Sequence, residues 1–489
     1  MKLRSALLAV FATAVWAVPA VATPTVATDQ GALSGVSDNG VVSYKDIPYV
    51  APPVGALRWQ APQPGPHWQG ARDASGFGPA CPQHATDSLV VRANLPQSED
   101  CLTLNVWAPE QRTEKLPVMV WIHGGGFTQG AASVPRFDGA ELARHRVVLV
   151  SFNYRLGRLG FFAYPGLDQV NFGLLDQIAA LQWVRRNIAA FGGDPDNVTV
   201  FGESAGGVAV EALMTSPLAK GLFAKAISES GGLFKTDSLG EARANAQSFA
   251  AKLNATGPDA LAMLRATDAA KIVSDDESGP ILDGKVLPEE IADAFAAGHI
   301  AKIPYIAGSN SDEGSQIGDG ANDWLTQPLG DRLAAVRALY ETDGKLSDTE
   351  FKHQIFNDRF FAGPAAITAA AVARAGAPSY VYRFGFLTDL AHRRGETGVR
   401  HGGELVFVFG FGPMAAFAPP QDSGMSATMQ SYWTNFAKTG DPNGAGLPPW
   451  PKFEGRSPQT LVIDDHPHTV ADFRKAQFEA VSPARTPAP

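Results

Sequence analysis

One pentapeptide constrains the fold of this chain more than any other feature. Residues 202–206 read Gly-Glu-Ser-Ala-Gly and directly follow a strand-like run at residues 198–201. The two glycines leave room where a strand that turns sharply into a helix brings two backbone segments almost into contact. Because residues 205–213 can form that helix, the pattern predicts a strand–turn–helix unit with Ser204 exposed at its apex. A serine in a glycine-rich turn can also be only a turn, so the rest of the chain must supply partners for it.

The first 22 residues have the composition of a secretory signal peptide. Lys2 and Arg4 supply the basic start, and residues 6–18 are apolar but too short to span a bilayer. Residues 20–22 (Ala-Val-Ala) fit the small-x-small pattern of a cleavage site. We therefore expect cleavage after Ala22 and export to the periplasm or the extracellular space. No later segment has the run of about 18 apolar residues that a transmembrane helix needs.

Charge and composition narrow the class of protein. The formal net charge of −9 argues against nucleic acid and anionic membranes as partners. With 45% hydrophobic residues the chain can bury a large core, and it shows neither an internal repeat nor a long linker. We expect one large domain over residues 23–478 and a disordered tail over residues 479–489. The sequence does not indicate an oligomeric state.

Strand and helix signals alternate through the central region. Residues 118–122 and 147–152 are apolar at consecutive positions, as in strands that are covered on both faces. Between residues 171 and 192, apolar residues recur at steps of three and four, which predicts an amphipathic helix. Further short strands are expected at residues 224–227, 304–307, 380–384 and 460–463. The alternation predicts an α/β fold with a large, mostly parallel central sheet and helices on both faces.

A second glycine-rich turn follows one of these predicted strands. Residues 123–126 read His-Gly-Gly-Gly, and successive glycines let backbone N–H groups point into a cavity with no side chain in the way. Such donors stabilise the negative charge that develops on a carbonyl oxygen during acyl transfer. We interpret the N–H groups of Gly125, Gly126 and Ala205 as an oxyanion hole. A flexible surface turn is the alternative, and His123 is interpreted as a buried support of the loop.

A catalytic base is sought among the histidines that follow the serine, because α/β-hydrolases place serine, acid and histidine in that order along the chain. These histidines are His299, His353, His392, His401, His466 and His468. His401 is the best candidate, because two glycines and the apolar run at residues 405–409 follow it and hold its loop beside packed structure. His392 lies in a basic run that is typical of a solvated loop.

The acid is expected on a loop that follows a strand. Residues 312–315 (Asp-Glu-Gly-Ser) lie just beyond the strand predicted at residues 304–307, and ligands in such sheets bind outside the carboxyl ends of the strands. Order and spacing do not distinguish Asp312 from Glu313, and Asp283 remains possible.

Cys81 and Cys101 are the two cysteines of the chain. In an exported protein a pair this close in sequence predicts one disulfide, which closes a loop of about 20 residues and contributes about 3 kcal/mol by restricting the unfolded chain. Two buried free thiols are the alternative. A metal site is not expected, because no second Cys or His pair lies at ligand spacing nearby.

Longer stretches resemble the type-B carboxylesterases, a family that includes cholinesterases and bacterial para-nitrobenzyl esterases. Residues 191–206 resemble the serine signature of that family, and residues 99–106 resemble its second signature. Further matches, which extend the resemblance to about residues 25–478, lie at residues 171–177, 312–315, 401–404 and 432–436. The resemblance implies the α/β-hydrolase fold and a carboxylic-ester hydrolase that needs no metal or organic cofactor.

The resemblance also implies roles for single residues. The family acid is the glutamate of the Asp-Glu-Gly-Ser stretch, which implies Glu313. The family histidine matches His401, and the first family disulfide matches Cys81–Cys101. Relatives form structural ion pairs at the positions of Arg58 with Glu99 and of Arg155 with Asp176.

Two more polar residues are expected to support the site. Glu203 precedes the serine directly and is expected to tune the electrostatic field at His401, although filling a polar niche is the alternative. Ser230 is expected as a hydrogen-bond partner behind the catalytic residues.

The sequence predicts the reaction more sharply than the substrate. The Cys81–Cys101 loop contains no Trp, the residue with which cholinesterases bind choline by a cation–π contact, so choline esters are not expected. Residues 86–98 are mostly polar, which favours small to medium soluble esters over the long-chain acylglycerols of an interfacial lipase. A non-catalytic adhesion homologue is disfavoured, because serine, acid, histidine and glycine loop are all present. The expected partner is therefore a small-molecule ester.

Overall fold

The computed structural model describes residues 23–84, 94–273, 278–318, 320, 323–342, 344–411 and 418–482. The predicted signal peptide lies outside these residues. Residue 479, where the sequence predicts the tail to begin, lies inside helix α15 (Lys475–Val481), so the folded chain continues past that boundary. Within the described residues, every helix is too short or too polar to cross a bilayer.

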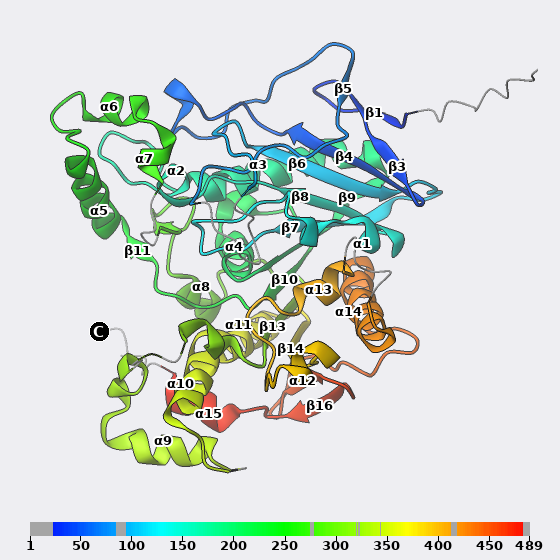
Figure 1. Cartoon of the computed structure of the whole chain (residues 1–489), viewed down its shortest axis with the longest axis vertical. Coiled ribbons are helices and arrows are strands. Elements are labelled where there is room, and N and C mark those ends of the chain that lie inside the picture. The colour runs from blue at the N-terminus through cyan, green and yellow to red at the C-terminus, as the bar shows by residue number, and fades with distance from the viewer. Residues whose placement is uncertain are drawn as a thin grey trace, which may run out of the picture.

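An 11-stranded sheet forms the centre of the structure (Figure 1). Its parallel strands, in spatial order, are β15 (Gln459–Ile463), β14 (Ser379–Phe384), β13 (Tyr305–Asn310), β10 (Lys225–Glu229), β9 (Gly193–Glu203), β7 (Leu116–Ile122) and β8 (Val148–Phe152). Antiparallel strands extend both edges: β16 (His468–Ala471) lies beside β15, and β6 (Thr103–Pro109), β4 (Val41–Pro48) and β3 (Val36–Asp38) lie beyond β8. The predicted α/β fold is confirmed, with a parallel centre inside a sheet that is mixed as a whole.

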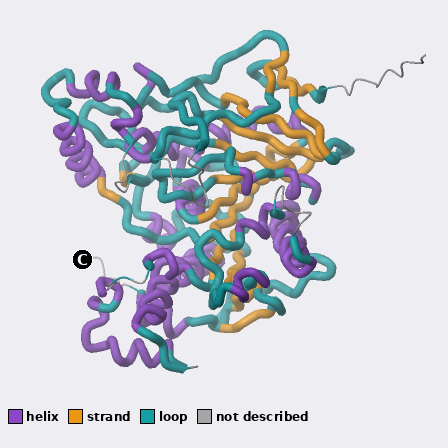
Figure 2. The backbone as a smooth tube through the Cα atoms, viewed as in Figure 1, coloured by secondary structure: helices purple, strands orange, loops and turns teal. Residues whose placement is uncertain are grey.

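The two faces of the sheet pack against different hydrophobic cores. Alternate residues of β7 enter opposite cores, Val118 and Val120 on one face and Met119 and Trp121 on the other. The first core is covered by α3 (Phe172–Asn187), α4 (Ala205–Thr215) and α11 (Gly363–Arg374). The second is covered by α1 (Ala140–Arg144), α13 (Leu405–Phe409) and α14 (Pro420–Thr439). Burial on both faces explains why the central strands are apolar at consecutive positions, and Figure 2 shows them as a band between helices.

The structure contains the predicted central strands and the predicted helix. The antiparallel strands of the N-terminal part were not predicted. Helix α3 passes into a short 3-10 turn and stops at Gly192, whose φ of 81° suits glycine. In β4, a register shift between Tyr44 and Ile47 interrupts the alternation that would mark a strand in the sequence. Three short strands, β1 (Thr25–Ala27), β2 (Ala32–Ser34) and β5 (Ala71–Asp73), form a separate small sheet.

The remaining short elements surround this framework. The other helices are α2 (Gly157–Gly160), α5 (Leu239–Lys252), α6 (Ala260–Ala266), α7 (Ala269–Ile272), α8 (Ile291–Ala297), α9 (Leu333–Tyr340), α10 (Asp348–Asn357) and α12 (Asp389–Arg393). Strands β11 (Asp237–Ser238) and β12 (Ile281–Leu282) form a two-stranded ribbon. A π-helix, η8 (Asp358–Ala362), lies between α10 and α11.

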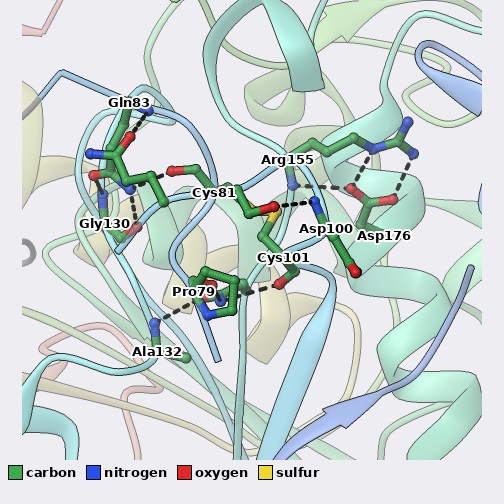
Figure 3. Close-up of a disulfide and its surroundings, with 12 residues drawn as sticks. Pro79, Cys81, Gln83, Asp100, Cys101, Gly130, Ala132, Arg155 and Asp176 are labelled. Carbon is green, nitrogen blue, oxygen red and sulfur yellow. Dashed lines mark hydrogen bonds and ion pairs between the residues drawn. A yellow bond between two sulfur atoms is a disulfide. The ribbon is translucent and has the colours of Figure 1, made fainter. Parts of the chain in front are cut away.

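The predicted disulfide is present. Cys81 and Cys101 are bonded, with their Cα atoms 5.1 Å apart, and both are buried. Figure 3 shows the bond close to the ion pair of Arg155 and Asp176, in which Arg155 Nη2 lies 2.7 Å from Asp176 Oδ1. Arg58 and Glu99 form the other expected pair, with Arg58 Nε donating to Glu99 Oε2 over 2.8 Å. Residues 85–93, which make up most of the segment used to weigh esterase against lipase, lie outside the described residues.

Replacing both cysteines by alanine should lower the free energy of unfolding by about 3 kcal/mol, because the unfolded chain regains the entropy of an open loop of about 20 residues. Urea unfolding of the Cys81→Ala/Cys101→Ala variant and of the parent measures the difference. A reducing agent should destabilise the parent and leave the double variant unchanged. Equal stability of parent and variant would show that the disulfide contributes nothing.

Candidate active site

Ser204 occupies a strained turn between a central strand and a buried helix. Strand β9 ends at Glu203, α4 begins at Ala205, and Ser204 between them has φ 56° and ψ −125°. A non-glycine residue adopts such a conformation at a cost of about 1–3 kcal/mol, and such residues cluster at active sites. A Cβ on Gly202 would lie 2.6 Å from the Gly206 carbonyl, and one on Gly206 would collide with the Ile122 carbonyl. Only glycine therefore fits on either side of the serine.

The three-glycine loop lies directly against this turn. A Cβ added to Gly124 would lie 3.1 Å from Ser204 Cβ, so the loop and the serine are in contact. Gly125 and Gly126 have φ values of 107° and 62°, which turn the backbone in a way that other residues rarely adopt. Within the described residues, the N–H groups of Gly125, Gly126 and Ala205 donate to no acceptor. They remain available beside Ser204 for an external oxygen.

His123 supports the loop from the interior, as the sequence predicts. Its ring is fully buried and stacks on Tyr154, with the ring centroids 4.5 Å apart. Burial lowers the pKa of His123 to about 4, so the ring is neutral at neutral pH. Its Nδ1 lies 3.0 Å from the Gly124 carbonyl oxygen, and the neutral Nδ1–H form donates there. His123 therefore holds the glycine loop and is unsuited to act as a base.

His401 and Glu313 are in direct contact. His401 Nδ1 lies 2.6 Å from Glu313 Oε2. The other carboxylate oxygen, Oε1, accepts a hydrogen bond from Ser230 Oγ at 2.6 Å and one from the Asn310 backbone N–H at 2.7 Å. Glu313 is fully buried. Ser230, expected as a hydrogen-bond partner behind the site, thus contacts the Glu313 carboxylate.

The other two candidate acids make different contacts. Asp312 begins a turn whose backbone pairs with Val399 and Arg400. Asp283 Oδ1 accepts the backbone N–H groups of the three residues that follow Gly284, closing its own turn. The geometry brings only Glu313, among the three candidate acids, to His401.

Three of the other candidate histidines have partners other than the candidate acids. His299 lies against the Glu289 carboxylate and His353 against the Gly318 carbonyl oxygen. His468 pairs with Asp464.

Glu203 reaches the opposite side of the His401 ring. Its Oε1 lies 3.1 Å from His401 Nε2. Among the described contacts, Ser204 Oγ forms no hydrogen bond with His401. The link between the two residues is Glu203, which precedes Ser204 in the chain and whose side chain contacts His401. The structure thus brings together the imidazole and both predicted carboxylates, with the serine beside them.

Two further buried carboxylates were missed by sequence reasoning. Glu404 accepts a hydrogen bond from Asn310 Nδ2, and Glu229 accepts one from Trp433 Nε1 at 2.7 Å. Glu404 belongs to residues 401–404, a stretch that resembles the family, and this resemblance was the one sequence signal that could have pointed to Glu404.

The carboxylates control the charge of His401. Burial disfavours the imidazolium, but the negative charges of Glu203 and Glu313 outweigh it and raise the pKa of His401. Burial raises the pKa of Glu203 to about 7 and that of Glu404 to about 8. Protons are therefore shared within this group near neutral pH. No set of side chains that could hold a metal ion occurs among the described residues.

The chain is similar in sequence to known proteins over most of its length. A family model described as the carboxylesterase family matches residues 22–481. The chain belongs to the carboxylesterase family. Para-nitrobenzyl esterase of Bacillus subtilis is 39% identical over 89% of this chain and 94% of its own. Fumonisin B1 esterase of Sphingopyxis macrogoltabida is 38% identical over 88% of this chain and 84% of its own.

A solved structure of a PNB esterase has a similar fold. It matches with a TM-score of 0.83 and 36% sequence identity, covering 94% of this chain and 99% of its own. The chain is therefore a carboxylesterase with the α/β-hydrolase fold, as its sequence motifs predict.

Replacing Glu203 by Gln should lower the pKa of His401 by about 1–3 units, because a negative charge 3.1 Å from the imidazole is removed. The imidazole resonances of His401, followed by NMR as a function of pH, measure the change. Glu211→Gln is the matched control, since Glu211 is an equally buried glutamate that bonds Ser228 and Tyr305 instead. An unchanged His401 pKa in Glu203→Gln would show that Glu203 only fills a polar niche.

Proposed function

We propose that this carboxylesterase hydrolyses esters through a triad of Ser204, His401 and Glu313. The observation that supports this most is the contact of His401 with the buried Glu313 carboxylate beside a serine in a strained strand–helix turn. The backbone N–H groups of Gly125, Gly126 and Ala205, for which the described part of the chain supplies no acceptor, belong to the two turns that meet at that serine. The same elements, in this order along the chain, are those that acyl transfer requires.

In the proposed reaction, His401 accepts the proton of Ser204 Oγ while that oxygen attacks the ester carbonyl carbon. The carbonyl oxygen becomes negative, and the N–H groups of Gly125, Gly126 and Ala205 stabilise it. The bond to the alcohol oxygen then breaks, and His401 returns its proton to the alcohol. A water molecule, deprotonated by His401, hydrolyses the acyl-enzyme in the same way and releases the acid.

Glu313 acts on the histidine and not on the substrate. Its contact with Nδ1 keeps the Nδ1–H form, which leaves Nε2 free to accept the serine proton, and its charge stabilises the imidazolium. For this transfer, His401 must turn from Glu203 toward Ser204. Catalytic hydrogen bonds often tighten only when substrate is bound.

We propose small to medium soluble esters as the substrates. The absence of Trp from the Cys81–Cys101 loop argues against choline esters. Two relatives are named para-nitrobenzyl esterase and fumonisin B1 esterase, and both names denote hydrolysis of an ester.

Ser204→Ala should fold normally and lose about 10⁴-fold or more in kcat, because the hydroxyl that is proposed to attack the ester carbonyl is removed. Turnover of a chromogenic ester measures the loss, and an organophosphate should label the parent on Ser204, as read by peptide mass spectrometry. Ser228→Ala is the matched control, since Ser228 bonds Glu211 and lies outside the triad. Near-normal turnover of Ser204→Ala would contradict the proposed nucleophile.

We also propose that the protein is exported and that its signal peptide is removed. Expressed with its full sequence in a bacterial host, the chain should appear in the periplasm or medium with Thr23 as its first residue. N-terminal sequencing of the secreted protein tests this, and replacing Ala20 and Ala22 by a bulky residue should block cleavage. A cytoplasmic protein that still begins at Met1 would exclude export.

A further inference from the structure

The directions of two proposed oxyanion donors are set by hydrogen bonds to the carbonyl groups that precede them. In a planar trans peptide, the C=O and the N–H that follows it point to opposite sides. The Gly124 carbonyl oxygen lies 3.0 Å from His123 Nδ1, so the Gly125 N–H points away from His123. The Gly125 carbonyl oxygen accepts the N–H groups of residues 128 and 129 at 3.1 and 3.0 Å, so the Gly126 N–H points away from that turn.

Gly130 closes this turn against His123. Its φ is 122°, a value that favours glycine. A Cβ on Gly130 would lie 2.3 Å from His123 Nδ1 and 2.5 Å from the Gly124 carbonyl oxygen. Gly130 therefore packs directly on the donor and the acceptor that together direct the Gly125 N–H. A displacement of Gly130 changes the space in which this bond forms.

The side chain of Gln83 holds Gly130 by both of its backbone polar groups. Gln83 Nε2 donates to the Gly130 carbonyl oxygen at 2.8 Å, and the Gly130 N–H donates to Gln83 Oε1 at 2.8 Å (Figure 3). Nε2 also donates to the Cys81 carbonyl oxygen at 3.0 Å. Gln83 is 5% exposed, so its amide depends on these protein partners rather than on water.

The disulfide lies behind this contact. Cys81 precedes Gln83 by two residues and is bonded to Cys101. A second buried amide, Asn153, donates through Nδ2 to the Cys101 carbonyl oxygen at 3.2 Å and accepts the Ala132 N–H at 2.9 Å. The chain that follows the glycine loop is thus tied by one amide to the Cys81 side of the disulfide and by the other to the Cys101 side.

We propose that Gln83 is a positioning residue for the oxyanion donors Gly125 and Gly126, and that the neighbouring disulfide keeps Gln83 in place for this task. Gln83 acts through Gly130, on which the glycine loop packs. Donors in an oxyanion hole are effective because they are aimed at the developing charge before the reaction begins. A small displacement should therefore lower kcat far more than it raises KM. This inference rests on the oxyanion role proposed above for the glycine loop.

Gln83→Met keeps the volume of the side chain and removes both amide bonds to Gly130. We expect kcat for a chromogenic ester to fall about 10- to 100-fold with KM almost unchanged, a smaller loss than the roughly 10²- to 10³-fold that follows removal of a donor. Gln30→Met is the matched control, since Gln30 is a similarly buried glutamine whose amide bonds Pro66 and Trp183. Its kcat should equal that of the parent.

A trifluoromethyl ketone analogue of the ester separates positioning from support of the fold. Ser204 Oγ adds to its carbonyl carbon, the proton passes to His401, and the carbonyl oxygen becomes an anion in the oxyanion hole, as in the transition state. The inhibition constant should rise in Gln83→Met by about the factor by which kcat/KM falls. The pKa of His401, followed by NMR, should stay at the parent value.

Titration with an organophosphate counts the active sites, so inactive protein does not enter kcat. A Gln83→Met variant that is less stable, yet has the parent kcat per active site and the parent inhibition constant, would overturn the proposal. A changed His401 pKa would also overturn it, because the loss would then arise in the triad.

The role of the disulfide is tested by combining the variants. Cys81→Ala/Cys101→Ala should lower kcat per active site in the parent. Once Gln83→Met is present, the same double substitution should change kcat by less than about twofold, because effects that pass through one contact do not add. An unchanged kcat in the disulfide variant, or losses that multiply in the combined variant, would show that the disulfide does not act through Gln83.

Ser204→Ala distinguishes this inference from the function on which it rests. If Ser204→Ala abolishes turnover while Gln83→Met keeps the parent kcat and inhibition constant, only the positioning role is rejected. If turnover survives in Ser204→Ala, the proposed nucleophile is rejected as well.

Discussion

The close approach of β9 and α4 at Ser204 is the constraint on which the site depends. The serine has a backbone conformation that costs free energy, and it is kept there because its neighbours cannot move. Its N–H donates to the Glu229 carbonyl and its own carbonyl accepts from the Val208 N–H. Strand β9 lies between two parallel strands, and nearly all of α4 is buried. The buried helix and the flanking strands therefore hold the serine in its strained conformation.

The second constraint is electrostatic, because one histidine is surrounded by more carboxylates than it can neutralise. Burial raises the pKa values of Glu203, Glu404 and Glu229. Protons bound to some of these carboxylates therefore remove negative charge that no nearby cation balances. Glu313, the carboxylate that contacts Nδ1 of the histidine, accepts hydrogen bonds from Ser230 and from the Asn310 backbone N–H. These bonds fix the orientation of the carboxylate toward the imidazole.

Local sequence patterns predicted those parts of the structure that depend on residues close together in the chain. Continuous apolar runs marked the central strands because both faces of the sheet are covered, and the pentapeptide marked the turn because only glycine fits beside the serine. Spacing did not separate Asp312 from Glu313, since adjacent side chains on an irregular turn point in directions that the sequence does not encode. Glu404 and the stacked rings of Phe234 and Phe360 escaped prediction for another reason. Phe234 and Phe360 meet only because the loop after β10 packs on η8, a contact between distant segments.

The loop after β10 connects the proposed acid with η8. Ser230 bonds the acid of the proposed triad, and Phe234, a few residues further on, stacks on Phe360 of η8. A substitution that moves this loop therefore affects both the contact to Glu313 and the packing on η8. Substitutions within one packed network have effects that do not add, whereas the effects of substitutions far apart usually do. The packing is tightest at Gly232, where a Cβ would lie 2.6 Å from the Phe360 carbonyl oxygen, so a side chain there would push the loop away from η8 and move Ser230 with it.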